Sequence, residues 1–156
     1  MRVVLRQALF GLVVVLLQWL LFSRLQLWGA YPDVVLLWVA FTALRFGRLF
    51  GSVAGFLSGL LLDVLLGTWG LHALLKTVTG FVVGLFRSES WEGPRLNPLQ
   101  AGLGALALAL VHQGLMAVFL ALEHGTRTTL LITGIWLGSA VYTAVVAVVW
   151  SLVRAR

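Results

Sequence analysis

The sequence predicts an all-α integral membrane protein, and three observations carry this prediction. Of the 156 residues, 61% are hydrophobic and only 10% are charged, whereas a soluble domain carries about 25% charged residues. Long apolar runs recur along the chain, as helices that cross a bilayer require. Nearly all of the basic residues stand at the ends of these runs. We therefore expect one transmembrane domain over residues 1–156, built as a six-helix bundle.

The six expected helices are joined by short connections. Residues 3–22 form a first span that is too long for a signal peptide and has no small-residue cleavage site after it. Residues 32–46 form the second, opened by Pro32 and Asp33, which suit a first helical turn. The glycine-rich third helix, residues 49–66, is linked through the tight turn 67–70 to the fourth, residues 71–86. The fifth and sixth helices cover residues 99–122 and 129–153.

The basic residues also predict the orientation. Six spans place both termini on one side, and a cytoplasmic location for that side satisfies the positive-inside rule. The cytoplasmic side then carries Arg2, Arg6, Arg45, Arg48, Arg87, Arg95, Arg154 and Arg156, and the opposite side carries only Arg24 and Arg127. The net charge of +6 is therefore a topology signal. No basic run is long enough to follow a nucleic-acid backbone, so we expect no nucleic-acid partner.

Several chemistries find no support in the sequence. The chain has no cysteine, which excludes disulfides, thiolate metal sites and cysteine nucleophiles. Its histidines and carboxylates do not show metal-binding spacing, and it has neither a phosphate-binding loop nor a Gly-x-Ser-x-Gly elbow. We therefore expect a protein that is not an enzyme, with no catalytic residues, metal or cofactor. The polar loop 87–98 is either a solvated connection that binds lipid headgroups or a contact for a cytoskeletal partner.

A glycine ladder in the third helix is the most distinctive pattern. Gly47, Gly51, Gly55 and Gly59 recur every four residues, so they lie above one another on a helix. Small residues let helices approach closely in a bilayer, where lipid tails remove the hydrophobic driving force for association. The ladder is thus a helix-packing or partner-binding groove. If a partner fills it, Gly55→Leu should abolish co-purification with that partner while membrane insertion persists.

Polar residues inside the expected spans form two groups. Asp63 continues the ladder, and His72 and Lys76 share one face of the next helix. We expect a direct or water-bridged Asp63–Lys76 pair, because an intramembrane charge is costly unless it is paired or faces a polar cavity. The cluster is either a polar or proton-linked site near the outer surface or a lock for the helical hairpin. His112 and Gln113 form an interior pair that serves as a ligand or proton relay, or as a hydrogen bond across helices.

The motif order resembles the rod shape-determining protein MreD family. The residues that carry the resemblance are Pro32-Asp33, Gly51, Gly55-Phe56, Gly59-Leu60-Leu61-Leu62-Asp63, Gly67 and Gly70-Leu71-His72-Ala73-Leu74. The motif-bearing part covers about residues 32–84, and length and span number fit along the whole chain. The resemblance implies a non-enzymatic component of the bacterial inner membrane that serves the cell-elongation machinery, or elongasome, and is needed for rod shape and lateral peptidoglycan synthesis.

The same resemblance implies partners and a fold. The implied direct partner is MreC, bound through its transmembrane region, within a complex that also contains MreB, RodA and its partner transpeptidase; membrane lipids surround the bundle. The implied fold resembles the substrate-binding subunits of energy-coupling-factor transporters. That likeness leaves an alternative function open, because fold does not dictate function. The protein would then bind a small solute or lipid-linked precursor in a pocket near Asp63, His72 and Lys76.

Overall fold

The computed structural model describes residues 2–22, 24–25, 27, 29–87, 97–124 and 131–154. These residues are helical apart from short connections and one isolated bridge between Leu27 and Ala30. Four of the helices are long and apolar enough to cross a membrane: Leu5–Phe22, Arg48–Leu66, Pro98–Leu122 and Gly134–Val153. The chain is therefore a helical membrane protein, as its composition predicts.

The described residues form six helices, as expected, and the ends of these helices differ from the predicted ones by a few residues. They are α1 (Arg2–Leu17), continued by the π-helical turn η1 (Gln18–Phe22), α2 (Val34–Phe46), α3 (Arg48–Leu66), α4 (Leu71–Gly84), α5 (Pro98–His124), and the π-helical η2 (Leu131–Gly138) continued by α6 (Ser139–Arg154). The greater part of the loop 87–98, and the end of the turn before the sixth helix, lie outside the described residues.

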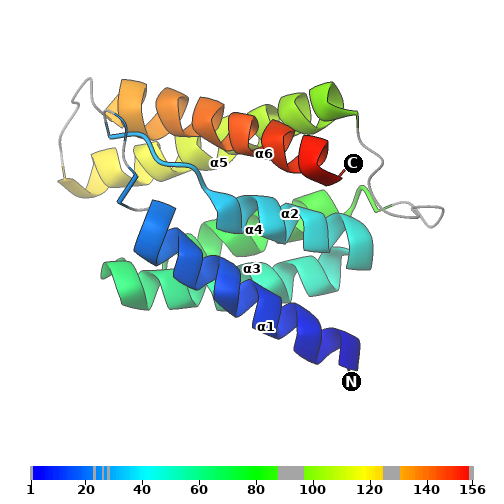
Figure 1. Ribbon diagram of the computed structural model, residues 1–156. Helices are drawn as coiled ribbons and strands as arrows, with labels where there is room; N and C mark the ends of the chain where they lie inside the picture. The colour runs from blue at the N-terminus through cyan, green and yellow to red at the C-terminus, as the bar shows by residue number, and fades with distance from the viewer. Residues whose placement is uncertain are drawn as a thin grey trace. The chain divides into compact units, whose positions relative to one another are not determined.

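The chain divides into two compact units, which are described separately. Unit 1 contains Met1–Leu21 and Val34–Gly93, and therefore α1 to α4; unit 2 contains Phe22–Asp33 and Pro94–Arg156, and therefore α5, η2 and α6. Figure 1 labels the helices of both units. That the two units act as one domain stays a prediction.

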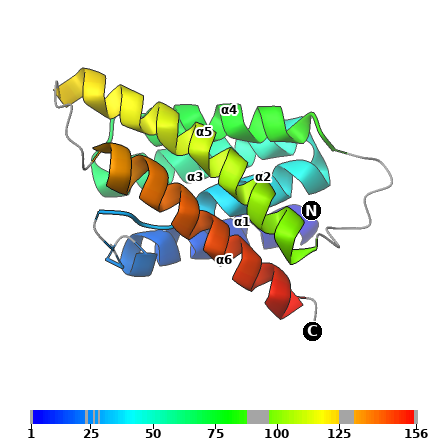
Figure 2. The same ribbon diagram turned by 90° about the horizontal axis from the view of Figure 1, so that it is seen from above.

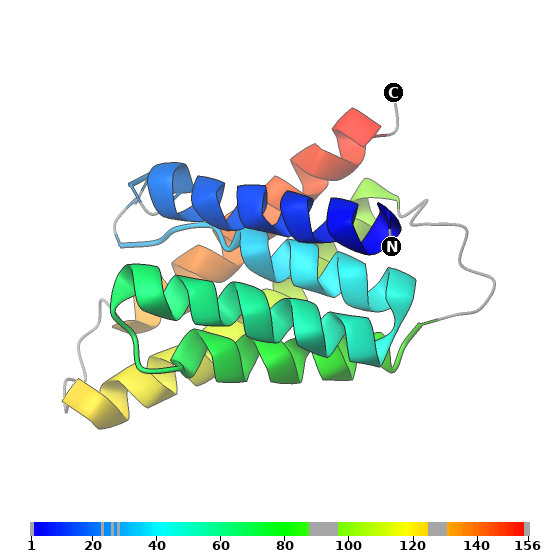
Figure 3. The ribbon, with the colours of Figure 1, turned by 90° about the horizontal axis from the view of Figure 1, so that it is seen from below.

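Unit 1 is a packed set of four helices. Helix α3 runs along α4, α2 contacts both of them, and α1 packs on α2 and α3 (Figure 3). A small apolar core joins three of these helices and contains Val14, Val15, Val35, Val39 and Leu62. Gly11 of α1 lies under the Trp38 indole of α2, because a Cβ at Gly11 would come within 2.5 Å of Trp38 Cζ2. The missing side chain therefore makes room for the largest side chain of α2.

Unit 2 is built around the pair formed by α5 and the continuous helix η2–α6 (Figure 2). Gly102 of α5 lies against Val148 of α6, because a Cβ at Gly102 would come within 2.6 Å of Val148 Cγ2. The indole Nε1 of Trp136 donates to the carbonyl of Leu110 at 2.9 Å, and Gly114 provides the space beside that indole. Small residues thus hold this helix pair together, as they do in other membrane bundles.

The contact between α3 and α4 is made backbone against backbone. A Cβ built on Gly59 would lie 2.5 Å from the Cα of Ala73, and one on Gly55 would lie 2.6 Å from the carbonyl carbon of Lys76. Both distances are far below van der Waals contact, so any side chain at these positions forces the helices apart. The protein's own fourth helix therefore fills the groove that the sequence left open to either a partner or α4.

The contact continues to the other end of the hairpin. A Cβ on Gly51 would lie 2.5 Å from the carbonyl oxygen of Gly80, and Gly84 of α4 faces the backbone of Arg48. Gly47 has a second role. It lies between α2 and α3 with φ of 89°, a conformation that favours glycine, and its carbonyl carbon is 2.8 Å from where a Cβ on Gly84 would stand. We call Gly51, Gly55, Gly59, Gly80 and Gly84 the glycine zipper.

A matched pair of glycine substitutions tests the zipper. Gly55→Ala should lower the free energy of unfolding by about 1–3 kcal/mol, because its methyl group overpacks against the α4 backbone. Gly104 of α5 has open space where its Cβ would stand. Gly104→Ala should therefore be neutral, or stabilising by up to about 1 kcal/mol through helix propensity. Thermal unfolding of the detergent-solubilised protein measures both effects, and equal stabilities for the two variants would contradict the zipper.

Candidate functional site

Asp63 is the most heavily engaged polar group of unit 1. Its side chain is almost completely buried near the end of α3. Oδ1 accepts hydrogen bonds from the Thr68 hydroxyl at 2.5 Å and from the His72 amide at 3.0 Å, and Oδ2 accepts one from the Ala73 amide at 2.8 Å. The N-cap residue of α4 is Gly70, which supplies no side-chain cap. Asp63 therefore caps α4 from the preceding helix, with its negative charge at the positive end of the α4 dipole.

The expected direct pair between Asp63 and Lys76 is corrected by this geometry. Among the described residues, the side-chain partners of Asp63 are one hydroxyl and two backbone amides, and the Lys76 ammonium is not one of them. The reason is local: the connection 67–70 brings the first turn of α4 to the carboxylate before Lys76 can reach it. Lys76 is 0% exposed, and its backbone carbonyl lies against Gly55. A water-bridged link stays a prediction.

His72 takes part in this arrangement through its backbone. Its amide donates to Asp63, and the residue is 6% exposed. The carbonyl of His72 lies against Gly59 of the zipper. The predicted cluster of Asp63, His72 and Lys76 is thus brought to one helical hairpin, where a carboxylate–amide cap and the zipper order it. The sequence allowed two interpretations of this cluster, a lock for the helical hairpin and a proton-linked site. The observed arrangement corresponds to the lock.

A second buried polar cluster lies in unit 2. His112 of α5 places Nε2 3.7 Å from Oδ2 of Asp33, which forms an ion pair when the imidazole is protonated. The Asp33 amide donates to Oγ1 of Thr143 at 2.9 Å, and the Tyr31 amide donates to Oγ of Ser139 at 3.1 Å. The two hydroxyls stand one turn apart on α6, so they hold the extended segment before α2 by its backbone.

Part of this cluster is predictable from the sequence. His112 and Gln113 were expected in the interior, and they are 2% and 1% exposed. Asp33 was assigned only to a helix start, and Ser139 and Thr143 were not singled out as a pair. Two sequence patterns could have indicated this cluster. Ser139 and Thr143 lie four residues apart in an apolar helix, and Asp33 lies between a proline and an apolar run. In the same segment, burial raises the pKa of the Tyr31 hydroxyl to about 12, and the Asp33 carboxylate adds to the increase.

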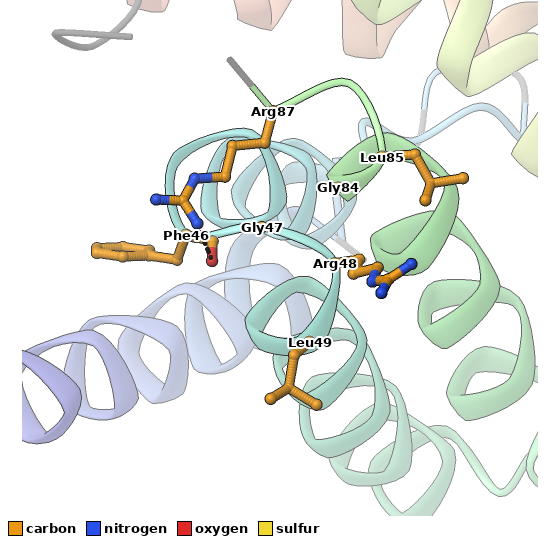
Figure 4. Close-up of a pocket in the computed structure, with 7 residues that line it drawn as sticks. All are labelled: Phe46, Gly47, Arg48, Leu49, Gly84, Leu85 and Arg87. Atoms are coloured by element: carbon orange, nitrogen blue, oxygen red, sulfur yellow. Dashed lines mark hydrogen bonds between the residues drawn. The ribbon is translucent and has the colours of Figure 1, made fainter. Parts of the chain in front are cut away.

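A shallow, open cavity of about 360 Å³ lies at the far end of the α3–α4 hairpin. It is lined by Phe46, Gly47, Arg48, Leu49, Gly84, Leu85 and Arg87 (Figure 4). Asp63 lies toward the opposite end of α3, about 22 Å away at 1.5 Å per residue. The solute-binding alternative predicted a pocket near Asp63, His72 and Lys76. This cavity includes none of these three residues, so a pocket beside them stays a prediction.

Comparison with known proteins adds no relative. No family model, curated protein or solved structure matches this chain. The resemblance to the MreD family therefore rests on the motif residues between Pro32 and Gly84.

Substitution of Asp63 tests the capping role. Asp63→Ala should lower the free energy of unfolding by about 2–4 kcal/mol, because it leaves two buried amides of α4 without their acceptor. Thr68→Val removes one of the three hydrogen bonds and should cost about 1 kcal/mol. Thermal unfolding measures the stabilities, and amide hydrogen exchange at His72 and Ala73 should accelerate only in Asp63→Ala. Unchanged exchange at these two amides would show that Asp63 does not cap α4.

Proposed function

We propose that this chain is a non-enzymatic membrane scaffold of the MreD type, serving the elongasome in rod shape and lateral peptidoglycan synthesis. In this proposal the protein lies in the bacterial inner membrane with both termini in the cytoplasm. Its helices cross the membrane six times, in an arrangement like that of the transporter substrate-binding subunits. MreC is its direct partner, bound through the transmembrane region, and MreB, RodA and the partner transpeptidase complete the complex.

One observation carries the proposal: the motif residues from Gly51 to Leu74 belong to a single hairpin, in which the glycines and Asp63 have defined packing and capping roles. Gly51, Gly55 and Gly59 make the zipper contacts with α4, and Asp63 caps α4. Gly67 ends α3 in the left-handed conformation, with φ of 72°. A glycine spacing that arose from leucine-rich composition alone would not be expected to put Gly51, Gly55 and Gly59 against the α4 backbone and Asp63 at its first amides. The packing of these glycines and the cap formed by Asp63 support the family resemblance.

The state of the polar groups supports a scaffold over a solute binder. The Asp63 carboxylate accepts three hydrogen bonds from donors of the α3–α4 hairpin. In unit 2 the Thr143 hydroxyl accepts from the Asp33 amide and donates to the Ser139 carbonyl. These bonds order the backbone of the protein itself. The faces that remain for a partner are the exposed apolar sides of the long helices, which include Leu9, Val64 and Val111 at 57%, 73% and 65% exposure.

Partner binding is tested by crosslinking from single cysteines, since the chain has none of its own. Cysteines replacing Leu9 of α1, Val64 of α3 and Val111 of α5 sample three outward faces. In cells that carry a cysteine in the transmembrane helix of MreC, one of these faces should give a crosslink. Ala109→Cys is the buried control, because Ala109 is 0% exposed, and it should give none. A membrane-inserted protein that crosslinks from no face would contradict direct docking of MreC.

The cellular role is tested by depletion. Removing the protein from the bacterium that encodes it should convert rods to spheres, which microscopy measures. Re-expression of the unchanged protein or of Gly104→Ala should restore rods, whereas Gly55→Leu should fail because it separates α3 from α4. Immunoblots of the membrane fraction show whether each variant is present. Cells that remain rods after complete depletion would rule out a role in cell shape.

A further inference from the structure

The cavity at the α2–α3 turn combines positive charge with space. Arg48 and Arg87 flank Gly47 in Figure 4, and an Nη1 of Arg87 donates to the carbonyl of Phe46 at 3.4 Å. A guanidinium carries five N–H donors, so this single long bond leaves most of the donors of Arg87 for another acceptor. The Arg45 guanidinium lies 5.2 Å from the centre of the Phe46 ring. Arg45, Arg48 and Arg87 therefore stand at the same end of the helical hairpin, with the guanidinium groups of Arg48 and Arg87 on opposite sides of Gly47 (Figure 4).

The rim of the same cavity is apolar. Leu49 is 71% exposed and Leu85 is 54% exposed, and Phe86 beside them is 75% exposed. Arg48 is also the first residue of a span long enough to cross the membrane. The cavity therefore lies at the boundary between hydrocarbon and headgroups, where basic residues and apolar side chains meet lipids of mixed character.

We propose that this cavity binds the phosphodiester of an anionic phospholipid. Arg48 and Arg87 are long and flexible, and in this proposal they turn from opposite sides of Gly47 to donate to the two free phosphate oxygens, for which a guanidinium fork is well suited. Leu49 and Leu85 contact the glycerol and the first carbons of the acyl chains. The volume of about 360 Å³ is open to the surface, so the headgroup would lie against the helix ends with one side exposed.

The apolar rim decides between a lipid and a free phosphate. Inorganic phosphate would use the arginines but would leave Leu49 and Leu85 in contact with water. A phospholipid satisfies the charges and covers the leucines at the same time. The inference is independent of the proposed function, because it uses only the hairpin, the arginines and the membrane character of the helices.

Lipid titration of the full chain tests this site. The protein is purified in a non-ionic detergent, and phosphatidylglycerol, phosphatidylcholine or inorganic phosphate is added in parallel series. Native mass spectrometry then measures the bound molecule. We expect phosphatidylglycerol to bind more tightly than phosphatidylcholine. Arg48→Gln and Arg87→Gln should each weaken phosphatidylglycerol binding about tenfold through the loss of charge-assisted hydrogen bonds.

Arg6→Gln is the matched control, because it removes one charge outside the cavity. The N-terminal end of α1, which carries Arg6, lies at the same end of unit 1 as the α2–α3 turn (Figure 3). It should weaken binding by no more than about fivefold, the effect of one charge near an anionic surface. Thermal unfolding without lipid verifies that each variant is folded.

Three results would overturn the site. Equal losses from all three arginine variants would indicate a diffuse surface charge. Equal affinity for phosphatidylcholine and phosphatidylglycerol would remove the role of the anionic phosphodiester. If inorganic phosphate binds with the same dependence on Arg48 and Arg87 while the lipids show no headgroup preference, the ligand is free phosphate and not a lipid.

Discussion

The structure of unit 1 depends on one constraint: the backbones of α3 and α4 touch, and no Cβ fits between them. This contact sets the register of the hairpin. Because Gly59 lies against Ala73, Asp63, one turn further along α3, meets the amides at the start of α4. At the other end, Gly84 lies against Arg48, which brings Arg87 beside the α2–α3 turn. The buried cap and the arginine-lined cavity are thus two consequences of one packing interface.

Both buried carboxylates show how an apolar chain accommodates charge. Burial of a carboxylate in hydrocarbon costs several kcal/mol unless donors or an opposite charge compensate for the lost water. Asp63 obtains its donors from the amides of α4, which would otherwise need a cap of their own. Asp33 lies 3.7 Å from His112, and hydroxyls of α6 hold its amide and that of Tyr31. Buried polar groups therefore fix how α4 begins in unit 1, and in unit 2 they hold the segment that contains Tyr31 and Asp33.

Periodicity and composition were sufficient to predict the six helices, the tight turn at 67–70 and the role of small residues in packing. They could not predict which helix fills the groove, because a row of glycines has the same pattern whether the opposing helix belongs to the chain or to a partner. The sequence led to a predicted pair of Asp63 with Lys76, because a sequence shows which side chains are charged but not which backbone amides lie near them. The link between Asp33 and His112 joins residues far apart in the sequence, and only tertiary structure brings them together.

The lengths of the helices bear on how the arginine end meets the membrane. Helices α2 and α4 have 13 and 14 residues, so each spans about 20 Å against a hydrocarbon thickness of about 30 Å. A short helix draws headgroups inward or thins the bilayer around it. Arginines at such ends extend toward the phosphates while their stems stay in apolar surroundings. In the proposed six-span arrangement, the phospholipid proposed at Arg48 and Arg87 would relieve this mismatch, because its headgroup would occupy the space at the ends of the short helices.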